Sequence, residues 1–407
     1  MSGRRDKVLI LESLGADYGG YFMARGLVRV LGAERVREWP YKRTHNGGRD
    51  HYPERVENVD PSAPDRPRRV IHVDGDGKIA YVPSFTGCEL WNHRGLWRSW
   101  VPGALPDAYV PNDGPVHFME SLEIPEEADD GIFDMVARGE FGLLVLNGVR
   151  WHGSAALHEL QATFGDRLPP LAVVDHEDYP QRRWDFTDAF RPAVYFKRTT
   201  LTTGHPCTYM FGDRPGLPVR PVPFSSMWDV PWVPWREREY DTCCLFGPTQ
   251  WSRGRLIDMT SAVVARVGAR GRFSLGHVPY LEYMRILSRT KVVVDQQSFG
   301  TDTVRFWEAV ASGAAVISDH CLVHPPPVLV PGEHFLQYDN DLSGRGDQQD
   351  FVRFAALLEA AMRDDGATEA LARRGYEAVR AHHTCEARAR YVIGEVRATG
   401  CDLGGLT

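Results

Sequence analysis

Continuous runs of aliphatic residues alternate with amphipathic segments along most of this chain. Aliphatic residues dominate the short runs at residues 8–11, 143–146, 171–175 and 291–295. Such runs are typical of strands that are covered on both faces, as in parallel sheets. Segments with helical spacing of apolar residues, such as 21–31, lie between them. The alternation predicts an α/β fold made of doubly wound, Rossmann-like parallel sheets.

The same two periodicities predict the remaining elements. Further strands are expected at residues 70–73, 79–82, 193–196, 242–247, 272–275 and 314–319. Further helices are expected at residues 131–138, 155–164, 254–267, 280–288, 351–363, 368–382 and 385–397, and one more helix opens at Arg305.

The segment 214–235 contains six prolines and is expected to run extended. A chain of 407 residues is also too long for one ordinary core. We therefore predict a first Rossmann-like domain at 1–220, a linker at 221–240, a second Rossmann-like domain at 241–384, and a C-terminal helix and tail at 385–407. The two domains are expected to face each other across a cleft.

Residues 41–125 interrupt the first domain. They are rich in Pro, Gly, Asp and aromatic residues, which predicts an irregular or hairpin insertion. Long insertions of this kind often face a substrate. Trp91, Trp97 and Trp100 form either a stacking platform for a ring or a core cluster.

Composition indicates an ordinary globular protein, with 43% hydrophobic and 25% charged residues. No apolar run is long enough to cross a bilayer, and the first residues lead directly into a strand rather than a secretory segment. We expect a cytoplasmic protein without stable membrane insertion. The net charge of -7 gives no overall attraction for nucleic acid. The seven cysteines show no paired spacing and are expected to be structural.

Residues 291–319 are the most informative part of the chain. They comprise a buried strand, a polar loop, a helix that carries Glu308 near its start, and a second buried strand. Loops at the carboxyl ends of parallel strands, where helix N-termini lie, bind anionic ligands in doubly wound folds. This segment therefore predicts a nucleotide or phosphate site.

Residues 281–295 and 299–319 resemble the group 1 glycosyltransferases of the GT-B fold, and more narrowly the spore-maturation-type branch. Residues 331–339 add a further match, and the likeness extends over 241–391. The resemblance implies a second domain that binds a nucleoside-diphosphate sugar and a first domain that holds the acceptor. It implies no catalytic metal and no cofactor beyond the donor.

The resemblance also assigns roles to single residues. Glu308 takes the position that grips the donor ribose, although a helix-start carboxylate is also stabilised by the helix dipole alone. Arg305 adds a fixed positive charge or makes a surface ion pair. Arg253 and Arg255, which follow the strand ending at Gly247, contact the leaving diphosphate or solvate an exposed helix face. The stretch 247–255 lacks the lysine that the family usually has.

Further positions around the donor complete the predicted site. His277 and Tyr280 lie where the family contacts the nucleobase. Many retaining members carry a second glutamate, and the matching position here, separated from Glu308 by seven residues, is Gly300. Its contacts to the sugar are expected from Thr301, Asp302 or Thr303, which leaves retention or inversion of the sugar open.

On the acceptor side, Asp17 in the glycine-rich loop 15–20 is the first candidate for a general base, and His93 is the second. Residues 175–178 at another strand end are expected to be polar residues that face the cleft.

The predicted function is metal-independent transfer of a sugar from a nucleoside-diphosphate sugar to a hydroxyl acceptor. The acceptor is a small molecule, a glycan, a protein or a modified nucleic-acid base. The glycine at position 300 motivates an alternative, a nucleotide-sugar sensor without transfer activity. A sugar-nucleotide epimerase is a further alternative.

Overall fold

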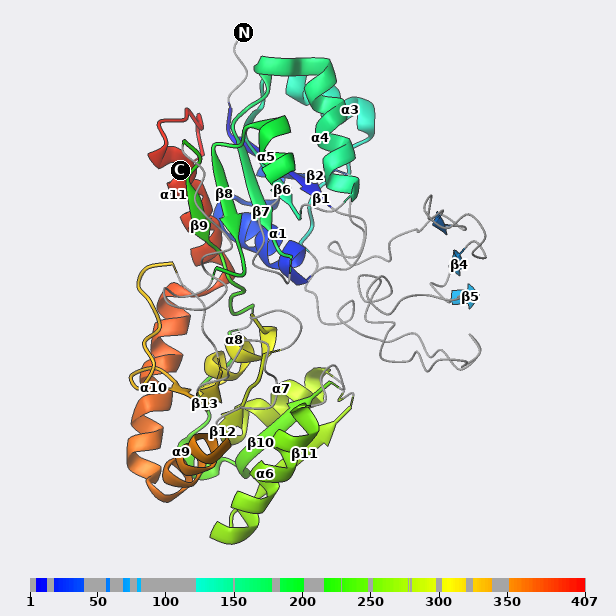
Figure 1. The fold of residues 1–407 in the computed structure, drawn as a ribbon. Coiled ribbons are helices and arrows are strands. Elements are labelled where there is room, and N and C mark those ends of the chain that lie inside the picture. Colours follow the sequence, from blue (N-terminus) through cyan, green and yellow to red (C-terminus); the bar gives the residue numbers. More distant parts are fainter. Residues whose placement is uncertain are drawn as a thin grey trace.

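The structure of the protein is a computed structural model. It describes residues 5–12, 18–39, 56–58, 69–73, 79–81, 122–148, 151–177, 184–200, 216–227, 229–247, 252–276, 278, 280–297, 302–319, 325–338 and 351–406. Two parallel sheets, each covered by helices, form two α/β domains one above the other in Figure 1. The predicted fold class is confirmed at this level.

The amino-terminal sheet has six parallel strands in the order β2-β1-β6-β7-β8-β9. Its strands are β1 (Lys7–Glu12), β2 (Val36–Trp39), β6 (Phe141–Asn147), β7 (Leu171–Asp175), β8 (Val194–Lys197) and β9 (Val219–Pro221). Its helices are α1 (Tyr18–Leu31), α3 (Asp129–Ala137), α4 (Trp151–Phe164) and α5 (Trp184–Phe190).

Both faces of this sheet are buried, which explains the continuous aliphatic runs. In β1, Val8 and Ile10 pack in one core cluster with residues of α1. Leu9 and Leu11 pack in a second cluster, on the opposite face, with residues of α3 and α4. A strand that is covered in this way has no solvent-facing positions to fill with polar residues.

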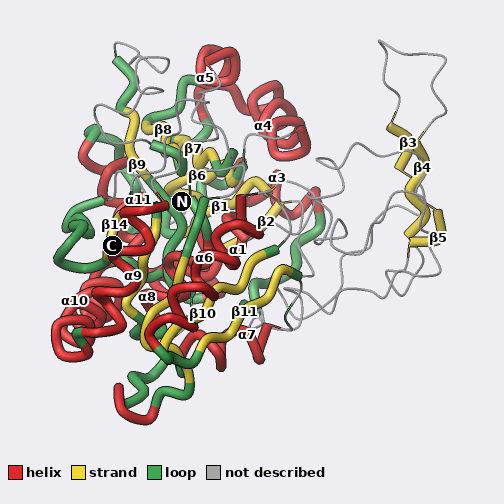
Figure 2. Tube along the Cα trace, turned by 60° about the horizontal axis from the view of Figure 1, so that its bottom comes forward, coloured by secondary structure: helices red, strands yellow, loops and turns green. Residues whose placement is uncertain are grey.

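The carboxy-terminal sheet has five parallel strands in the order β11-β10-β12-β13-β14. Its strands are β10 (Tyr240–Phe246), β11 (Gly271–Leu275), β12 (Thr290–Val294), β13 (Ala315–Ser318) and β14 (Leu336–Gln337). Its helices are α6 (Ser252–Val267), α7 (Tyr280–Ser288), α8 (Val304–Ala311), α9 (Phe351–Arg363) and α10 (Asp365–His382). Figure 2 shows β10 and β11 side by side at one edge.

Two cysteines of β10 belong to this core. Cys243 and Cys244 are fully buried, and burial raises the pKa of the Cys243 thiol to about 12. A thiol with so high a pKa is not a nucleophile at neutral pH. The prediction that these cysteines are structural fits this environment.

The last helix, α11 (Cys385–Ala398), returns to the amino-terminal domain and packs along α1. The two helices approach closely at Gly26, where a Cβ atom would lie 2.2 Å from the carbonyl oxygen of Cys385. Glycine at position 26 therefore permits this packing.

A small antiparallel sheet is described within the predicted insertion. It consists of β3 (Val56–Asn58), β4 (Arg69–Val73) and β5 (Ile79–Tyr81). The two strands predicted in this stretch correspond to β4 and β5. None of the helices in the described residues is both long enough and apolar enough to span a membrane.

Candidate donor site

Polar side chains gather where the strands of the carboxy-terminal sheet end. β10 ends at Phe246, Asp295 directly follows β12, and Asp319 directly follows β13. The carboxyl ends of parallel strands meet at the same sheet edge, which is where doubly wound folds bind ligands. Helix α8 begins at this edge, on the side of the carboxy-terminal domain that is nearest the amino-terminal domain in Figure 1.

Asp295 organises the start of α8. Its carboxylate is buried and accepts hydrogen bonds from the hydroxyls of Thr303, at 3.0 Å, and Ser318, at 2.8 Å. The Thr303 hydroxyl also accepts from the backbone N–H of Phe306 at 3.2 Å and so caps α8. One side chain therefore fixes the helix to the end of β12.

Two arginines converge on the ring of Phe246. The guanidinium carbons of Arg253 and Arg305 lie 5.2 Å and 4.7 Å from the ring centroid. Arg305 Nη1 is 3.4 Å from Asp295 Oδ1. Arg305 Nε is buried without a hydrogen-bond partner among the described residues. The ring and one carboxylate thus hold Arg305 and leave one N–H without an acceptor.

Arg253 is held by backbone carbonyls. Its guanidinium donates to the carbonyl oxygens of Gly247, at 3.0 Å, and Gln296, at 3.3 Å. Burial, followed by the positive charge of Arg305, lowers the pKa of Arg253 to about 9, against the pull of Asp295 and Asp319. Two cations in a poorly hydrated place repel each other. A bound anion would relieve that repulsion.

Asp319 shapes the turn that supplies these carbonyls. Its carboxylate accepts from the backbone N–H of Gln297 at 2.8 Å, and its carbonyl oxygen accepts from the Gln297 side chain at 2.6 Å. Gln296 and Gln297 are both buried. The backbone beside Arg253 is therefore fixed by the neighbouring strand end.

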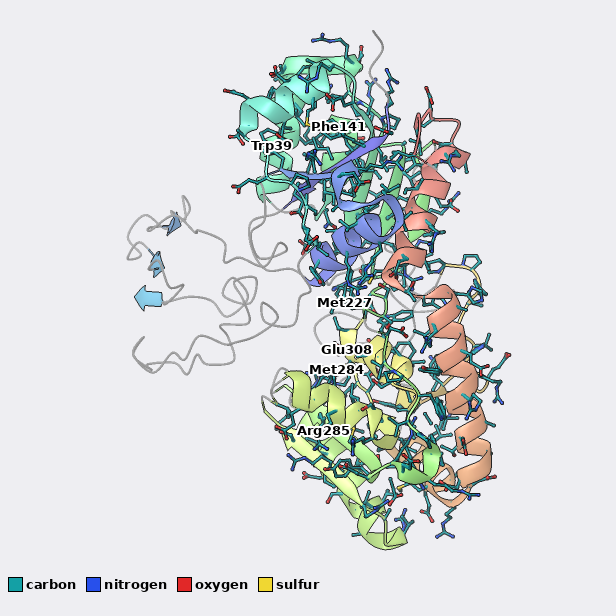
Figure 3. The ribbon with its side chains drawn as sticks, turned by 180° about the vertical axis from the view of Figure 1, so that it is seen from behind. Trp39, Phe141, Met227, Met284, Arg285 and Glu308 are labelled. Carbon is teal, nitrogen blue, oxygen red and sulfur yellow. The ribbon has the colours of Figure 1, made fainter. Side chains whose placement is uncertain are left out.

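Glu308 lies in the second turn of α8 and is 5% exposed. The phenol of Tyr283 on α7 donates to Glu308 Oε2 at 2.9 Å. Burial, followed by the charge of Glu308, raises the pKa of Tyr283 well above its usual value, so the phenol stays protonated as a donor. Figure 3 labels Glu308 on the side of its domain that is closer to the other domain.

The structure separates the other predicted donor contacts. Arg255 lies on an exposed position of α6, whereas Arg253 is buried at the site. The Asp302 carboxylate, expected to touch the sugar, instead accepts from the Phe224 backbone N–H and the Trp307 indole. Thr303 serves as the α8 cap. Each of these two side chains is thus engaged within the protein.

Several predicted residues lie outside the described part of the chain. These are Asp17, His93, His277 and Thr301, together with Gly300. Tyr280 is the first residue of α7, but its side chain is also outside the described part. Their roles stay predictions.

A second polar cluster lies at the carboxyl ends of β6, β7 and β8. Lys197 Nζ is 2.9 Å from Asp175 Oδ2, and both side chains are almost fully buried. Burial lowers the pKa of Lys197, and Asp175 opposes that shift. His176 Nε2 lies 2.8 Å from Asn147 Oδ1. Of the predicted cleft residues, Asp175 is therefore a buried ion-pair partner, whereas His176 is half-buried.

Sequence reasoning missed three of these contributors. Tyr283 lies in the matched stretch but carries no motif signal of its own. Asn147 and Lys197 each directly follow a predicted strand, and a polar residue at the carboxyl end of a parallel strand is the signal that would have found them.

Comparison with known proteins decides the class of the second domain. Residues 233–394 match a protein-family model described as "Glycosyl transferase-like". The carboxy-terminal domain is a glycosyl transferase-like domain. The prediction of a glycosyltransferase is confirmed for the part of the chain that the family model covers. No curated protein matches the sequence of this chain.

One solved structure supports the fold of the whole chain beyond this glycosyl transferase-like domain. Sucrose-phosphate synthase from Thermosynechococcus elongatus is 14% identical, with 97% of this chain and 99% of that chain covered and a TM-score of 0.51. The predicted GT-B fold is confirmed by this similarity. The pneumococcal O-GlcNAc transferase GtfA, crystallised with UDP and GlcNAc, is 12% identical over 85% of this chain and 69% of that chain, with a TM-score of 0.44.

Proposed function

We propose that this protein transfers a sugar from a nucleoside-diphosphate sugar to a hydroxyl acceptor, as a member of the spore-maturation-type branch. One observation carries the proposal. Arg253 and Arg305 converge on Phe246 at the carboxyl edge of the sheet, inside the domain that matches the glycosyl transferase-like family. A diphosphate is the anion that such a pair suits best.

The chemistry follows from charge. As the sugar–phosphate bond breaks, negative charge grows on the leaving diphosphate, and preformed cations in a water-poor site stabilise it most. Arg253 and Arg305 take this role, assisted by the N-terminal end of α8. Glu308, held by Tyr283, accepts hydrogen bonds from the ribose hydroxyls.

The two guanidinium groups supply positive charge where other enzymes use a divalent cation, so we propose that transfer is metal-independent. We also propose a cytoplasmic location. The cysteines in the described residues, Cys243, Cys244, Cys385 and Cys401, carry free thiols. Free thiols fit a reducing compartment.

The acceptor belongs, in this proposal, at the carboxyl edge of the amino-terminal sheet. His176, Asn147 and the buried Lys197–Asp175 pair supply polar groups there. Closure of the two domains would bring the acceptor hydroxyl to the donor and exclude water.

A panel of labelled nucleotide sugars, supplied with diverse hydroxyl acceptors, tests the proposal. We expect one donor to be consumed and its sugar to appear on an acceptor, with no change in rate when EDTA is added. Binding without turnover across all acceptors would favour a sensor. Conversion of the donor to an isomeric sugar nucleotide without an acceptor would favour an epimerase.

A further inference from the structure

A buried carboxylate joins the start of α8 to the segment that connects the domains. Asp302 is 4% exposed. Its Oδ2 accepts from the backbone N–H of Phe224 at 2.6 Å, and its Oδ1 accepts from the indole Nε1–H of Trp307 at 2.9 Å. Phe224 lies in residues 222–227, which follow β9 and which we call the crossing segment. Asp302 therefore bonds to both the crossing segment and α8.

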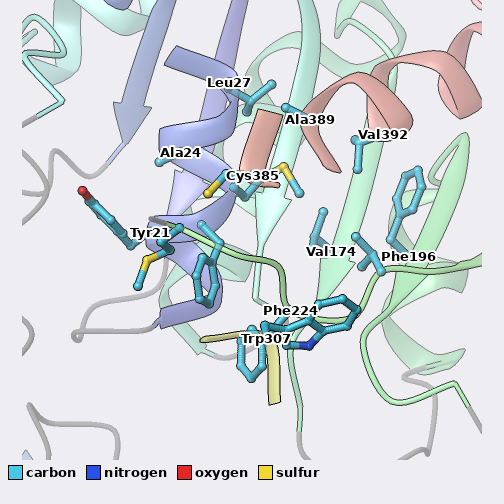
Figure 4. Packing of buried hydrophobic residues seen from close by; sticks show 14 of the residues in the cluster. Tyr21, Ala24, Leu27, Val174, Phe196, Phe224, Trp307, Cys385, Ala389 and Val392 are labelled. Carbon is cyan, nitrogen blue, oxygen red and sulfur yellow. The ribbon is translucent and has the colours of Figure 1, made fainter. Parts of the chain in front are cut away.

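Arginines from two other elements hold the same point. Arg388 on α11 donates to the carbonyl oxygens of Pro223 and Phe224, each at 3.2 Å, and its guanidinium lies 5.1 Å from the Trp307 ring. Arg198, which directly follows β8, lies 4.5 Å from the Phe224 ring. Figure 4 shows the side chains of Phe224 and Trp307 next to each other in this core.

The residue after Asp302 belongs to the donor site. Thr303 caps α8 and donates to Asp295. Helix α8 also carries Arg305 and Glu308. A shift of the crossing segment relative to α8 must therefore either break the hydrogen bonds of Asp302 or move the side chains that hold the donor.

We infer that Asp302 is a positioning residue that links the arrangement of the two domains to the donor site without touching the donor. The inference rests on the proposed function. It predicts that loss of the Asp302 contacts lowers turnover, because turnover needs both domains. Donor affinity should stay unchanged, because it needs the second domain alone.

Burial and the charged groups around Asp302 set the pH at which this carboxylate titrates, so its contacts can be followed by a pH titration. Arg198 faces it from the end of β8 and Arg388 from α11, and His383, which precedes α11, lies 3.1 Å from Arg388. Burial raises the pKa of Asp302 to about 6, against the pull of both arginines. The carboxylate therefore changes its charge within the pH range that is accessible to experiments on the folded protein.

Nuclear magnetic resonance of protein labelled with ¹⁵N in Phe and Trp reads these contacts directly. Between pH 5 and pH 8, the Phe224 amide and the Trp307 indole signals should shift together, with a midpoint about 6. In Asp302→Asn, which retains His383, neither signal should titrate there. Wild-type signals that stay constant, or that titrate equally in the variant, would overturn the inference.

Kinetics test the role of the contacts. We expect Asp302→Asn to lower kcat about tenfold and to change the dissociation constant of UDP, GDP, ADP or TDP, whichever the wild type binds, by less than about twofold. Asp364→Asn, a change to the cap of α10, is the matched control and should alter neither. Weaker nucleotide binding with unchanged kcat would mean that Asp302 contacts the donor, which contradicts the inference. Absence of transfer in the wild type would reject the proposed function, while the resonance titration still decides the contacts of Asp302.

Discussion

Two guanidinium groups over one aromatic ring define the site at the scale of single residues. Arg253 is held by three backbone carbonyls, from Gly247, Gln296 and Gln297. Arg305 has one carboxylate partner and a side chain that is 15% exposed. Arg253 therefore also supports the local backbone, and of the two cations Arg305 is better placed to respond to a ligand.

Arg305→Ala should lower kcat about 100-fold, because the growing charge on the diphosphate loses its preformed cation, and should raise the donor dissociation constant much less. Steady-state kinetics and calorimetry measure the two effects. Arg363→Ala, on an exposed position of α9, is the control. Unchanged turnover in Arg305→Ala would remove this residue from catalysis.

Tyr283→Phe should raise the donor KM about tenfold with a smaller change in kcat, since the phenol orients Glu308 toward a part of the donor that does not react. Tyr376→Phe removes another phenol that donates a hydrogen bond, to the carbonyl of Val230 at 2.9 Å, and should leave KM unchanged. An equal KM in Tyr283→Phe and the wild type would show that Glu308 needs no such support.

Protonation of Asp302 should stabilise the folded protein. Its pKa rises from 3.8 to about 6 on folding, so the folded state binds the proton more tightly than the unfolded chain. The stability from this proton is present below pH 3.8 and is lost as the pH rises through about 6. Over this pH window, the free energy of unfolding of the wild type should therefore fall by about 3 kcal/mol relative to that of Asp302→Asn. Melting temperatures measured from pH 4 to pH 7.5 should show a widening difference in favour of the variant, and a constant difference would contradict the shift.

At the scale of elements, the packing of α11 on α1 returns the end of the chain to the first domain. The two helices approach closely at Gly26 and Cys385. Gly26→Ala should destabilise the protein by several kcal/mol because the backbones must separate. Gly394→Ala, also in α11 but with no atom within 4 Å of an added Cβ, should be neutral or slightly stabilising. Thermal unfolding of both variants compares them, and equal melting temperatures would refute the close contact.

The elements that could be predicted from sequence are those whose burial leaves a clear pattern. β1 and β12 have apolar residues facing both ways, so their aliphatic runs are continuous. β2 is fully buried but includes Arg37 and Glu38. These charged residues interrupt the apolar pattern, so the sequence did not predict this strand. β9 lies in the proline-rich segment and, among the described strands, pairs only with β8, and an edge strand tolerates Pro221.

The donor site was predictable only as far as a local motif reaches. Glu308, Arg305 and Arg253 follow from short stretches next to strand ends. The role of Tyr283 depends on a contact across 25 residues, and that of Asp302 on one across 78 residues. Such contacts depend on how helices and domains pack, and no periodicity in the sequence records them.

At the scale of the whole molecule, the described part of the chain crosses between the two domains twice. The crossing segment leads from β9 toward β10, and α11 leads back from α10. The two crossings are hydrogen-bonded to each other through the backbone of Ser226. Its N–H donates to the carbonyl oxygen of His383 at 2.9 Å, and its carbonyl oxygen accepts from the Cys385 N–H at 3.1 Å. Sugar transfer between the domains would therefore depend on these two linked interdomain connections, which lie beside the donor site.

A crystal structure of the protein with an unreactive analogue of the donor that the panel identifies tests the donor site directly. We predict diphosphate oxygens within hydrogen-bond distance of Arg305 and ribose hydroxyls on Glu308, at the carboxyl ends of β10, β12 and β13. A nucleotide bound elsewhere, with Arg305 and Glu308 still contacting only protein, would show that the donor site is not here.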